Sequence, residues 1–391
     1  MGPEADRLDT PAGVKSPTRM ARPKRSSIKG KLLLGAGIAG VAGFAAAYRF
    51  ALRYRERVGY PARNAVEGSP AGFGLEYENV RITSAAGSLA AWFVPATPAA
   101  PTAAATPAEP EPAREPAAER TAGPAVVVVH GWESNRGRTF AHVRYLHAAG
   151  FHCLVFDVRG HGDSPTDDLP VNVPEFAEDT VAAVRWLARR PEVESVGVLG
   201  HSMGGAGAIV AAAREPLIQA VVSMSAPADV VLITRKTFEM AEMNIPEPIA
   251  TPLAWFTAAL LLAPRRHGLH EASATVAAAR YRGPLLLIHG AQDHGVPVGH
   301  LEMIARAAAR QRDEVDPEVE TLVLPDFGHR WLYEDAGCRR KTAAFFAEAL
   351  GGLDPDVAGR RAADVEVKRP DDPVYGFGGL AGKTPTGPAG S

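Results

Sequence analysis

The segment 196–205, with the sequence VGVLGHSMGG, constrains the fold of this chain more than any other. An apolar β-type run leads directly into a Gly-x-Ser-x-Gly motif, and a run of small residues typical of a closely packed helix follows at 206–213. Such a corner holds the serine, Ser202, in a strained turn with its hydroxyl at the carboxyl end of a sheet. Gly200 and Gly204 are required because a Cβ at either position would collide with the neighbouring strand or helix. The motif predicts a nucleophilic serine; the alternative is a glycine-rich turn with a solvent-facing serine.

Strand and helix patterns alternate from about residue 75 onward. Apolar runs predict strands at 75–83, 89–94, 125–129, 152–156, 196–199, 220–224, 285–288 and 321–324. Helical spacing of apolar residues appears at 138–149 and 175–190. Strands separated by helices of this length imply an α/β fold, with a mostly parallel sheet and helices on both faces, opened by one antiparallel pair.

Two further polar residues follow the last predicted strands, at the edge where open α/β sheets bind ligands. Asp293 lies in GAQDHGVPV and His329 lies in LPDFGHR. A serine hydroxyl is a poor nucleophile at neutral pH, so His329 is expected to take its proton while Asp293 orients the imidazole. An isolated histidine is otherwise a capping or surface residue, and an aspartate in a loop is otherwise a turn former. Asp229, after the strand 220–224, is the rival acid.

Two backbone N–H groups are candidates for an oxyanion hole. Met203 follows the serine, so its N–H lies at the positive end of the predicted helix. Trp132 ends the HGW sequence that follows the strand 125–129 and supplies the second candidate N–H. Together these groups would stabilise the negative oxygen of a tetrahedral intermediate.

Five motifs in order give the chain a resemblance to the α/β-hydrolases, in particular to monoacylglycerol lipases and serine aminopeptidase-like hydrolases. They are HGW (130–132), FDVRGHGDS (156–164), GHSMGG (200–205), HGAQDHGVP (289–297) and PDFGH (325–329). The resemblance covers residues 72–350 and implies a lid inserted at 227–283. It implies a structural role for His161 and Asp163, in the loop after a strand. The apolar run 253–263 within the lid is either packing for the core or a wall for an acyl chain.

The remaining segments are predicted to be two tails and an insert. Residues 1–31 form a basic stretch without apolar periodicity, and residues 351–391 are rich in Gly, Pro and Asp, so both are predicted to be disordered. Residues 95–124 are a Pro/Ala/Glu-rich insert with almost no large apolar residue, which predicts a flexible surface excursion.

Residues 32–52 are predicted to be a transmembrane anchor, because a long uncharged run lies between basic flanks. Two alternatives remain. GAGIAG (35–40) matches the dinucleotide-binding pattern G-x-G-x-x-G, although an arginine-rich stretch stands where that fold needs a second strand. AAA (45–47) would suit a cleaved signal peptide. The basic residues are more numerous before the run than after it, which favours an extracytoplasmic catalytic domain.

These patterns predict a membrane-anchored serine hydrolase that cleaves carboxylic esters of small acyl or lipid-like substrates through an acyl-enzyme. The triad needs no metal and no organic cofactor. The net charge of −2 and the lack of a basic patch interleaved with aromatics argue against nucleic-acid binding. Thioester, amide or peptide hydrolysis and acyl transfer on the same triad remain open, as does a non-catalytic, partner-binding protein that retains the fold. The oligomeric state is left open.

Overall fold

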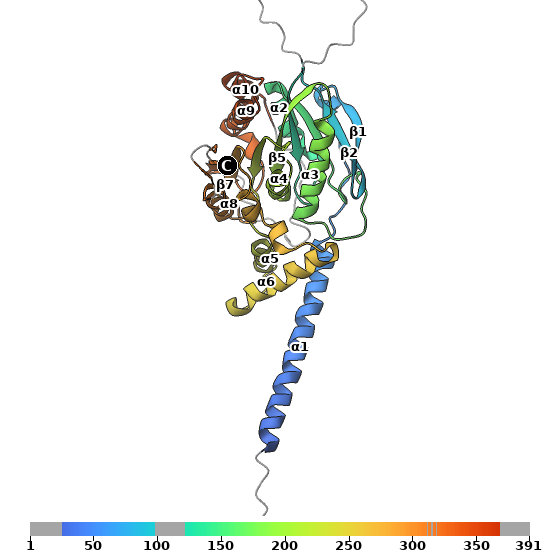
Figure 1. The fold of residues 1–391 in the computed structure, drawn as a ribbon, viewed down its shortest axis with the longest axis vertical. Coiled ribbons are helices and arrows are strands. Elements are labelled where there is room, and N and C mark those ends of the chain that lie inside the picture. The colour runs from blue at the N-terminus through green and yellow to red at the C-terminus, as the bar shows by residue number, and fades with distance from the viewer. Residues whose placement is uncertain (1–25, 98–121, 311, 314–315, 318, 368–391) are drawn as a thin grey trace, which may run out of the picture. The chain divides into compact units, whose positions relative to one another are not determined.

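One eight-stranded sheet organises the chain (Figure 1), in a computed structural model that describes residues 26–97, 122–310, 312–313, 316–317 and 319–367, with side chains from residue 40 onward. The strand order is β1-β2-β4-β3-β5-β6-β7-β8. Strands β1 and β2 are antiparallel to each other, β2 is antiparallel to β4, and the other neighbours are parallel. The strands are β1 Glu78–Ser84, β2 Gly87–Val94, β3 Gly123–Val129, β4 His152–Phe156, β5 Val193–His201, β6 Ala220–Met224, β7 Leu285–Gly290 and β8 Val319–Leu324.

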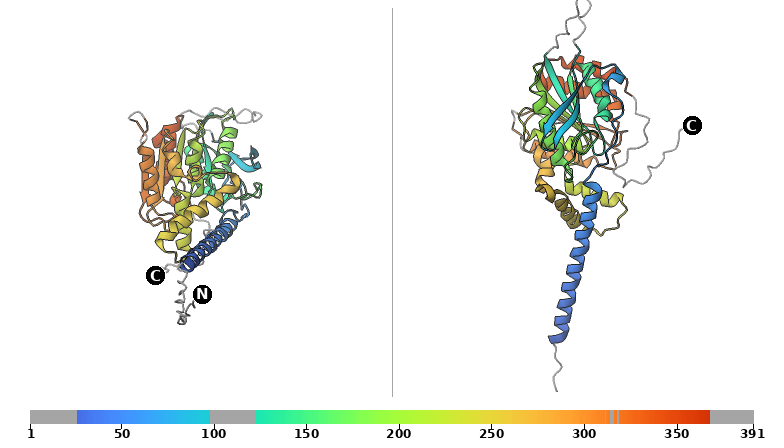
Figure 2. Two further views of the ribbon diagram at one scale, coloured as in Figure 1. Left: turned by 60° about the horizontal axis from the view of Figure 1, so that its bottom comes forward. Right: turned by 90° about the vertical axis from the view of Figure 1, so that its right-hand side faces the viewer.

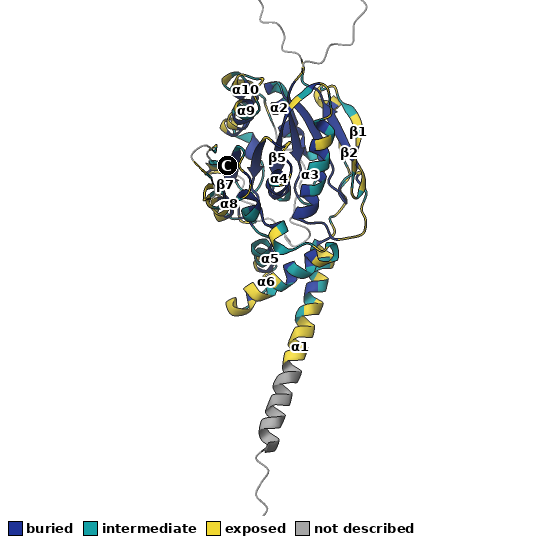
Figure 3. Cartoon of the chain, in the orientation of Figure 1, coloured by how far each residue is buried: buried dark blue, intermediate teal, exposed yellow. Residues whose placement is uncertain are grey.

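Helices cover both faces of the sheet, as the alternating pattern predicts (Figures 1 and 2). Side chains of β3 alternate between the two faces, because successive residues of a strand point to opposite sides. Val127 and Val129 join one apolar core, and Val126 and Val128 join the other. The first core includes α3 (Val173–Leu187), α4 (Met203–Ala212) and α8 (Gly299–Ala309), and the second includes α2 (Phe140–Ala149), α9 (Ala336–Leu350) and α10 (Pro355–Ala363). Figure 3 shows the strands buried between these layers.

The N-terminal region contains a long helix, α1, from Ser26 to Val58. It crosses the boundary between two compact units, residues 1–47 and 48–391. GAGIAG (35–40) lies inside this continuous helix, which excludes the dinucleotide-binding alternative because that motif needs a strand followed by a tight turn. Within the described residues, no helix combines the length and the apolar character needed to cross a membrane. The first eight residues of the expected anchor, 32–39, lie outside the residues whose side chains are described.

Residues 227–283, the segment expected to form a lid, contain α5 (Val230–Met240), α6 (Glu247–Leu262) and α7 (Ala274–Ala278), with short 3-10 turns before α7. Ala254, Ala258 and Leu261 of α6 are buried. Ile249 and Trp255 of the same helix are 55% and 57% exposed. One side of α6 is therefore packed and the other is exposed, and the segment meets the helices on the sheet through α7, which contacts α4 and α8. Its function as a lid stays a prediction.

The predicted boundaries of the tails and the insert need correction. The predicted tail 351–391 contains α10, which begins where the Asp354 carboxylate accepts a hydrogen bond from the Val357 N–H (2.8 Å). At its other end, the Arg339 guanidinium donates to the carbonyls of Ala362 (3.0 Å) and Ala363 (2.6 Å). Small alanines let this helix pack against α9, so the lack of large apolar residues is misleading here.

Two smaller corrections concern where elements begin. Helix α1 begins at Ser26, inside the predicted tail 1–31. Strand β3 begins at Gly123, so the predicted insert 95–124 ends slightly earlier than expected. Residues 1–25, 98–121 and 368–391, where the rest of the predicted tails and insert fall, lie outside the described residues.

Candidate active site

Ser202 lies in a strained corner between β5 and α4. Its backbone has φ 54° and ψ −120°, a conformation that residues other than glycine rarely adopt. The Ser202 N–H donates to the Met224 carbonyl of β6 (2.8 Å), which ties the corner to the next strand. A Cβ on Gly200 would overlap the Gly204 backbone, and one on Gly204 would overlap the backbone at the end of β3. The two glycines therefore permit the close approach that the turn requires.

Ser202, His329 and Asp293 form one hydrogen-bonded chain. The Nε2 atom of His329 lies 3.0 Å from the Ser202 hydroxyl oxygen, and its Nδ1 atom lies 2.6 Å from Oδ2 of Asp293. The other Asp293 oxygen accepts hydrogen bonds from the N–H groups of Gly295 (3.0 Å) and Val296 (2.8 Å). The structure thus brings together three residues of which the first and the last, Ser202 and His329, lie more than a hundred positions apart in the sequence.

The pKa of the Asp293 carboxyl is held below its usual range. Burial alone would raise this pKa, but hydrogen bonds from His289 and His329, the charge of His329 and the Val296 N–H together outweigh burial. The carboxylate is therefore ionised at neutral pH and able to stabilise an imidazolium at His329.

Two histidines with no role expected from the sequence support the hydrogen bonds that join Ser202, His329 and Asp293. The Nε2–H of His201 donates to the His329 carbonyl (2.8 Å), which positions the backbone that carries the imidazole. Burial, together with the neighbouring charge of His329, lowers the pKa of His201 to about 3, so its ring is neutral. The Nε2–H of His289 donates to the Val296 carbonyl (2.7 Å) and lies 3.3 Å from the Asp293 carboxylate. Both histidines stand inside quoted motifs, GHSMGG and HGAQDHGVP, which is the signal that could have identified them.

The HGW loop lies against the corner that holds Ser202. A Cβ on Gly131 would stand 3.3 Å from the Ser202 Cβ. His130 stabilises the loop, since its Nδ1–H donates to the Gly131 carbonyl (2.7 Å) and its Nε2 accepts from the Val158 N–H (3.0 Å). Met203 is the first residue of α4, whose first N–H groups have no partner within the helix. The loop of Trp132 and the start of α4 therefore meet at Ser202, where an oxyanion hole is expected.

The other candidate polar residues lie in structural positions. Asp229 caps α5, where its carboxylate accepts from the Val231 N–H (2.7 Å). Asp163 lies 2.7 Å from the Arg136 guanidinium and His161 donates to the Arg159 carbonyl (3.1 Å), as expected of a structural loop. The structure thus places these side chains in helix caps and loop contacts, and joins Asp293 to His329.

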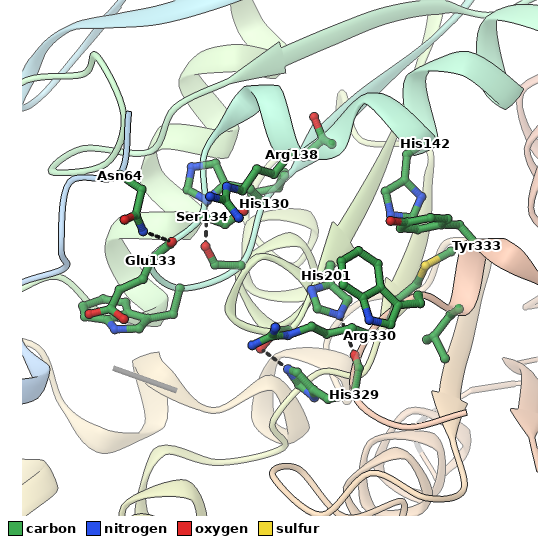
Figure 4. A pocket seen from close by; sticks show the side chains of 18 of the residues that line it. Asn64, His130, Glu133, Ser134, Arg138, His142, His201, His329, Arg330 and Tyr333 are labelled. Atoms are coloured by element: carbon green, nitrogen blue, oxygen red, sulfur yellow. Dashed lines mark hydrogen bonds between the residues drawn. The ribbon is translucent and has the colours of Figure 1, made fainter. Parts of the chain in front are cut away.

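A cavity of about 380 Å³ opens at Ser202 and His329 (Figure 4). Its wall combines aromatic and apolar groups from Trp132, Trp331 and Leu332 with the polar side chains of Arg138 and Arg330. Burial lowers the pKa of His142, on the same wall, to about 4, so this histidine is neutral at physiological pH. A small organic molecule with both apolar and polar parts would fit such a wall.

Comparisons with known proteins also find similarity to hydrolases. The model of a family described as "Serine aminopeptidase, S33" matches residues 121–260. An uncharacterized protein of Mycobacterium tuberculosis is 29% identical over 226 residues, which cover 55% of this chain and 72% of that protein. The sn-1-specific diacylglycerol lipase ABHD11 of Xenopus tropicalis is 33% identical over 104 residues, or 26% of this chain and 31% of the lipase.

A solved esterase from Pyrococcus furiosus superposes with a TM-score of 0.55 at 22% identity, and the match covers 75% of this chain and 98% of the esterase. At this identity the likeness shows a shared fold alone. The eight-stranded sheet, the strained Ser202 corner and these similarities agree with one another. The chain belongs to the α/β-hydrolase superfamily and is a serine hydrolase.

Proposed function

We propose that this protein hydrolyses carboxylic esters through an acyl-enzyme. The observation that carries the proposal is the hydrogen-bonded chain from Ser202 through His329 to Asp293, which ends at an open cavity. Ser202 Oγ bonds to the ester carbonyl carbon while His329 Nε2 takes its proton, and the N–H groups of Trp132 and Met203 bind the oxyanion. When the carbon–oxygen bond breaks, His329 returns the proton to the departing alcohol.

Water then completes the reaction. His329 takes a proton from a water molecule, and the water oxygen attacks the acyl carbon of the Ser202 ester. Collapse of the second tetrahedral intermediate releases the carboxylic acid and returns the proton to Ser202. Asp293 remains ionised throughout and stabilises each imidazolium that forms.

An ester is the proposed substrate because part of the cavity wall is apolar and a related protein is a diacylglycerol lipase. Thioesters, amides and peptides remain alternative substrates, since the same triad would cleave them and the matched family model is described as a serine aminopeptidase. Acyl transfer to an alcohol would need only a different nucleophile in the second half of the reaction. A non-catalytic, partner-binding protein would leave the triad without use.

A panel of 4-nitrophenyl esters from acetate to laurate, paired with matched 4-nitroanilides, tests the proposal. We expect ester hydrolysis with a clear optimum in chain length and little anilide cleavage. Ser202→Ala should lower kcat/KM by at least about 10³-fold and abolish labelling by a fluorophosphonate, because only an activated hydroxyl reacts with that probe. Ser88→Ala, at an exposed serine on β2, is the matched control. Faster cleavage of anilides than of esters would replace the proposal with a peptidase or amidase.

We further propose that residues 32–52 attach the protein to a membrane, with the catalytic unit on the extracytoplasmic side. The support is the long uncharged run between basic flanks and the exposure of Val41 (71%) and Phe44 (63%) on α1. The full chain should stay with membranes after a carbonate wash, and a chain beginning at residue 59 should not. Protease added to intact cells should cut within 95–124. Recovery of the full chain in the soluble fraction would overturn attachment, and cleavage only after lysis would reverse the orientation.

A further inference from the structure

A short segment between α1 and the sheet lies along the active-site cavity. Residues 59–67, called the strap below, follow α1 and precede β1, and they contain no helix or strand. Ala62 and Asn64 of the strap line the cavity together with the HGW loop. Figure 4 shows the Asn64 side chain directed at Glu133. The strap lies outside residues 121–260, which match the family model, so that similarity assigns it no role.

The strap is fixed to the loops around the sheet at its start and in its middle. The Gly59 carbonyl accepts a hydrogen bond from the Val171 N–H (2.7 Å). The Arg63 guanidinium donates to the carbonyls of Gly162 (3.1 Å) and Ser164 (2.8 Å), in the loop after β4. These contacts give the strap a defined position, from which its other residues can support a neighbouring loop.

The neighbouring loop is the one that contains HGW, and hydrogen bonds join it to the strap in both directions. The Asn64 Nδ2–H donates to the Glu133 carbonyl (2.6 Å), and the Ala62 N–H donates to the Glu133 carboxylate (3.3 Å). In return, Nδ2 of the buried Asn135 donates to the carbonyls of Asn64 (3.2 Å) and Ala65 (3.0 Å). A change in the strap is therefore transmitted directly to the loop.

Glu133 has a backbone conformation that a glutamate rarely adopts. Its φ is 52°. It is the third residue of a turn that closes with a hydrogen bond from the Ser134 N–H to the Gly131 carbonyl (3.3 Å). A positive φ at this place favours glycine, because a Cβ makes the left-handed region unfavourable. Such strain persists only where neighbouring contacts hold it, and the hydrogen bond from Asn64 to the Glu133 carbonyl is one of those contacts.

We propose that Asn64 is a positioning residue, which keeps the Trp132 N–H aimed at the oxyanion by supporting the strained turn at Glu133. Relaxation of Glu133 to a negative φ would rotate the peptide that joins it to Trp132, directly beside this N–H. A displaced donor lowers the rate because it no longer meets the charge that develops in the transition state. The inference rests on the ester hydrolase proposed above and adds a residue that its motifs do not contain.

Substitutions of Asn64 in the full chain test this role. Asn64→Asp keeps the size of the side chain but has no N–H to donate, and Asn64→Ala removes the group. We expect each to lower kcat on 4-nitrophenyl butyrate at least about tenfold and to change KM less than about threefold, because the oxyanion forms only after the substrate has bound. Thermal unfolding checks that both variants stay folded. Asn244→Ala, in the exposed loop between α5 and α6, is the matched control.

Glu133→Gly separates positioning from general damage. Glycine adopts a positive φ without strain, so the turn then needs less support, and Asn64→Ala should lower kcat by less than about threefold in the Glu133→Gly background. Glu242→Gly, at an exposed glutamate with φ 53°, is the matched control and should leave the larger loss intact. Equal losses from Asn64→Ala in both backgrounds, or a rise in KM with unchanged kcat, would overturn the positioning role.

The rate of labelling by a fluorophosphonate separates this inference from the ester hydrolase. The attack of Ser202 on phosphorus also builds negative charge on an oxygen, so labelling depends on the oxyanion hole even if no ester is hydrolysed. We expect Asn64→Ala to be labelled at least about tenfold more slowly than the parent protein, and Glu133→Gly to restore part of the rate. Equal rates would overturn the positioning role and leave Ser202 as the nucleophile. An unlabelled parent protein would overturn both proposals.

Discussion

The loops around Ser202 and the segment 227–283 are held by different kinds of interaction. Around Ser202, backbone and side-chain hydrogen bonds of 2.6–3.0 Å join the loops that carry Ser202, Asp293 and His329. The segment 227–283 joins the helices that cover the sheet mostly through α7, which packs against α4 and α8, while α6 packs against α5. Its polar attachments include Arg265, which binds Asp167 through two hydrogen bonds (2.5 and 2.8 Å), and His267, which binds Glu175 (2.8 Å).

The two kinds of interaction tolerate displacement of the residues differently. Hydrogen bonds depend steeply on direction, so a shift of one loop disturbs every partner in the chain from Ser202 to Asp293. Apolar contacts are non-directional, so α6 can repack at modest cost. We therefore expect conservative substitutions to reduce activity strongly in the loops around Ser202, and substitutions on the exposed side of α6 to leave the fold intact.

The largest effect is expected at Asp293. Asp293→Asn keeps the size of the side chain but removes the charge that stabilises the His329 imidazolium, so kcat should fall by about 10⁴-fold. Asp229→Asn should change kcat by less than about twofold, because asparagine also caps helices well. Steady-state kinetics with one ester measure both variants. The reverse ranking would move the acid of the triad to the end of β6.

The next effect is expected at His201, which positions the His329 backbone through a hydrogen bond. His201→Ala should lower kcat by about 10–100-fold through misplacement of the imidazole, with a smaller change in KM. His201→Gln retains an N–H donor of similar reach and should restore part of the rate. Equal losses in the two variants, with a matching loss of thermal stability, would indicate a purely structural role.

A smaller effect is expected on α6, where buried and exposed residues share one helix. Leu261→Ala should reduce the free energy of unfolding by about 2–5 kcal/mol, because it opens a cavity in a packed layer. Trp255→Ala should change that free energy by about 0.5 kcal/mol or less, and should shift the preferred acyl chain length if the segment lines the acyl site. Chemical denaturation and the ester panel provide the two measurements. A large loss of stability in Trp255→Ala would instead assign the tryptophan to packing.

The smallest effect is on the pH dependence of stability, because acidification changes the contributions of His201 and His267 in opposite directions. His201 has a lowered pKa in the folded protein, so its contribution to stability is present above the unfolded pKa of about 6.5 and is lost as the pH falls toward 3. The hydrogen bond to Glu175 raises the pKa of His267, so its contribution is present below about 6.5 and is lost as the pH rises through the folded pKa.

Unfolding curves between pH 8 and pH 5 test this sign difference. His201→Gln should flatten the loss of stability on acidification, and His267→Gln should steepen it, each by less than about 1.4 kcal/mol per pH unit. Parallel curves for the two variants and the parent protein would show that neither histidine changes its protonation on unfolding in this range.

Much of the architecture was predictable from local patterns. The buried strands and the small-residue helix after Ser202 have distinctive composition, and the parallel sheet with helices on both faces follows from their alternation. Helix α10 was missed because it packs through alanines and depends on the Arg339 guanidinium for its last carbonyls. Neither feature leaves a periodic apolar signal. His201 and His289 were missed as supporting residues because each binds a backbone carbonyl, and the motifs that contain them do not indicate that contact.

The sequence by itself determined the corner at Ser202 and the order of serine, acid and base, because a Gly-x-Ser-x-Gly turn and the ends of strands are local features. Only the tertiary structure decided which acid meets His329. Asp229 and Asp293 both follow a strand, but one caps a helix and the other lies 2.6 Å from the imidazole. The structure alone also placed Arg138 and Arg330 on the wall of one cavity, since such a long-range arrangement depends on how β3 and β8 are placed in the sheet and not on any pattern within either segment.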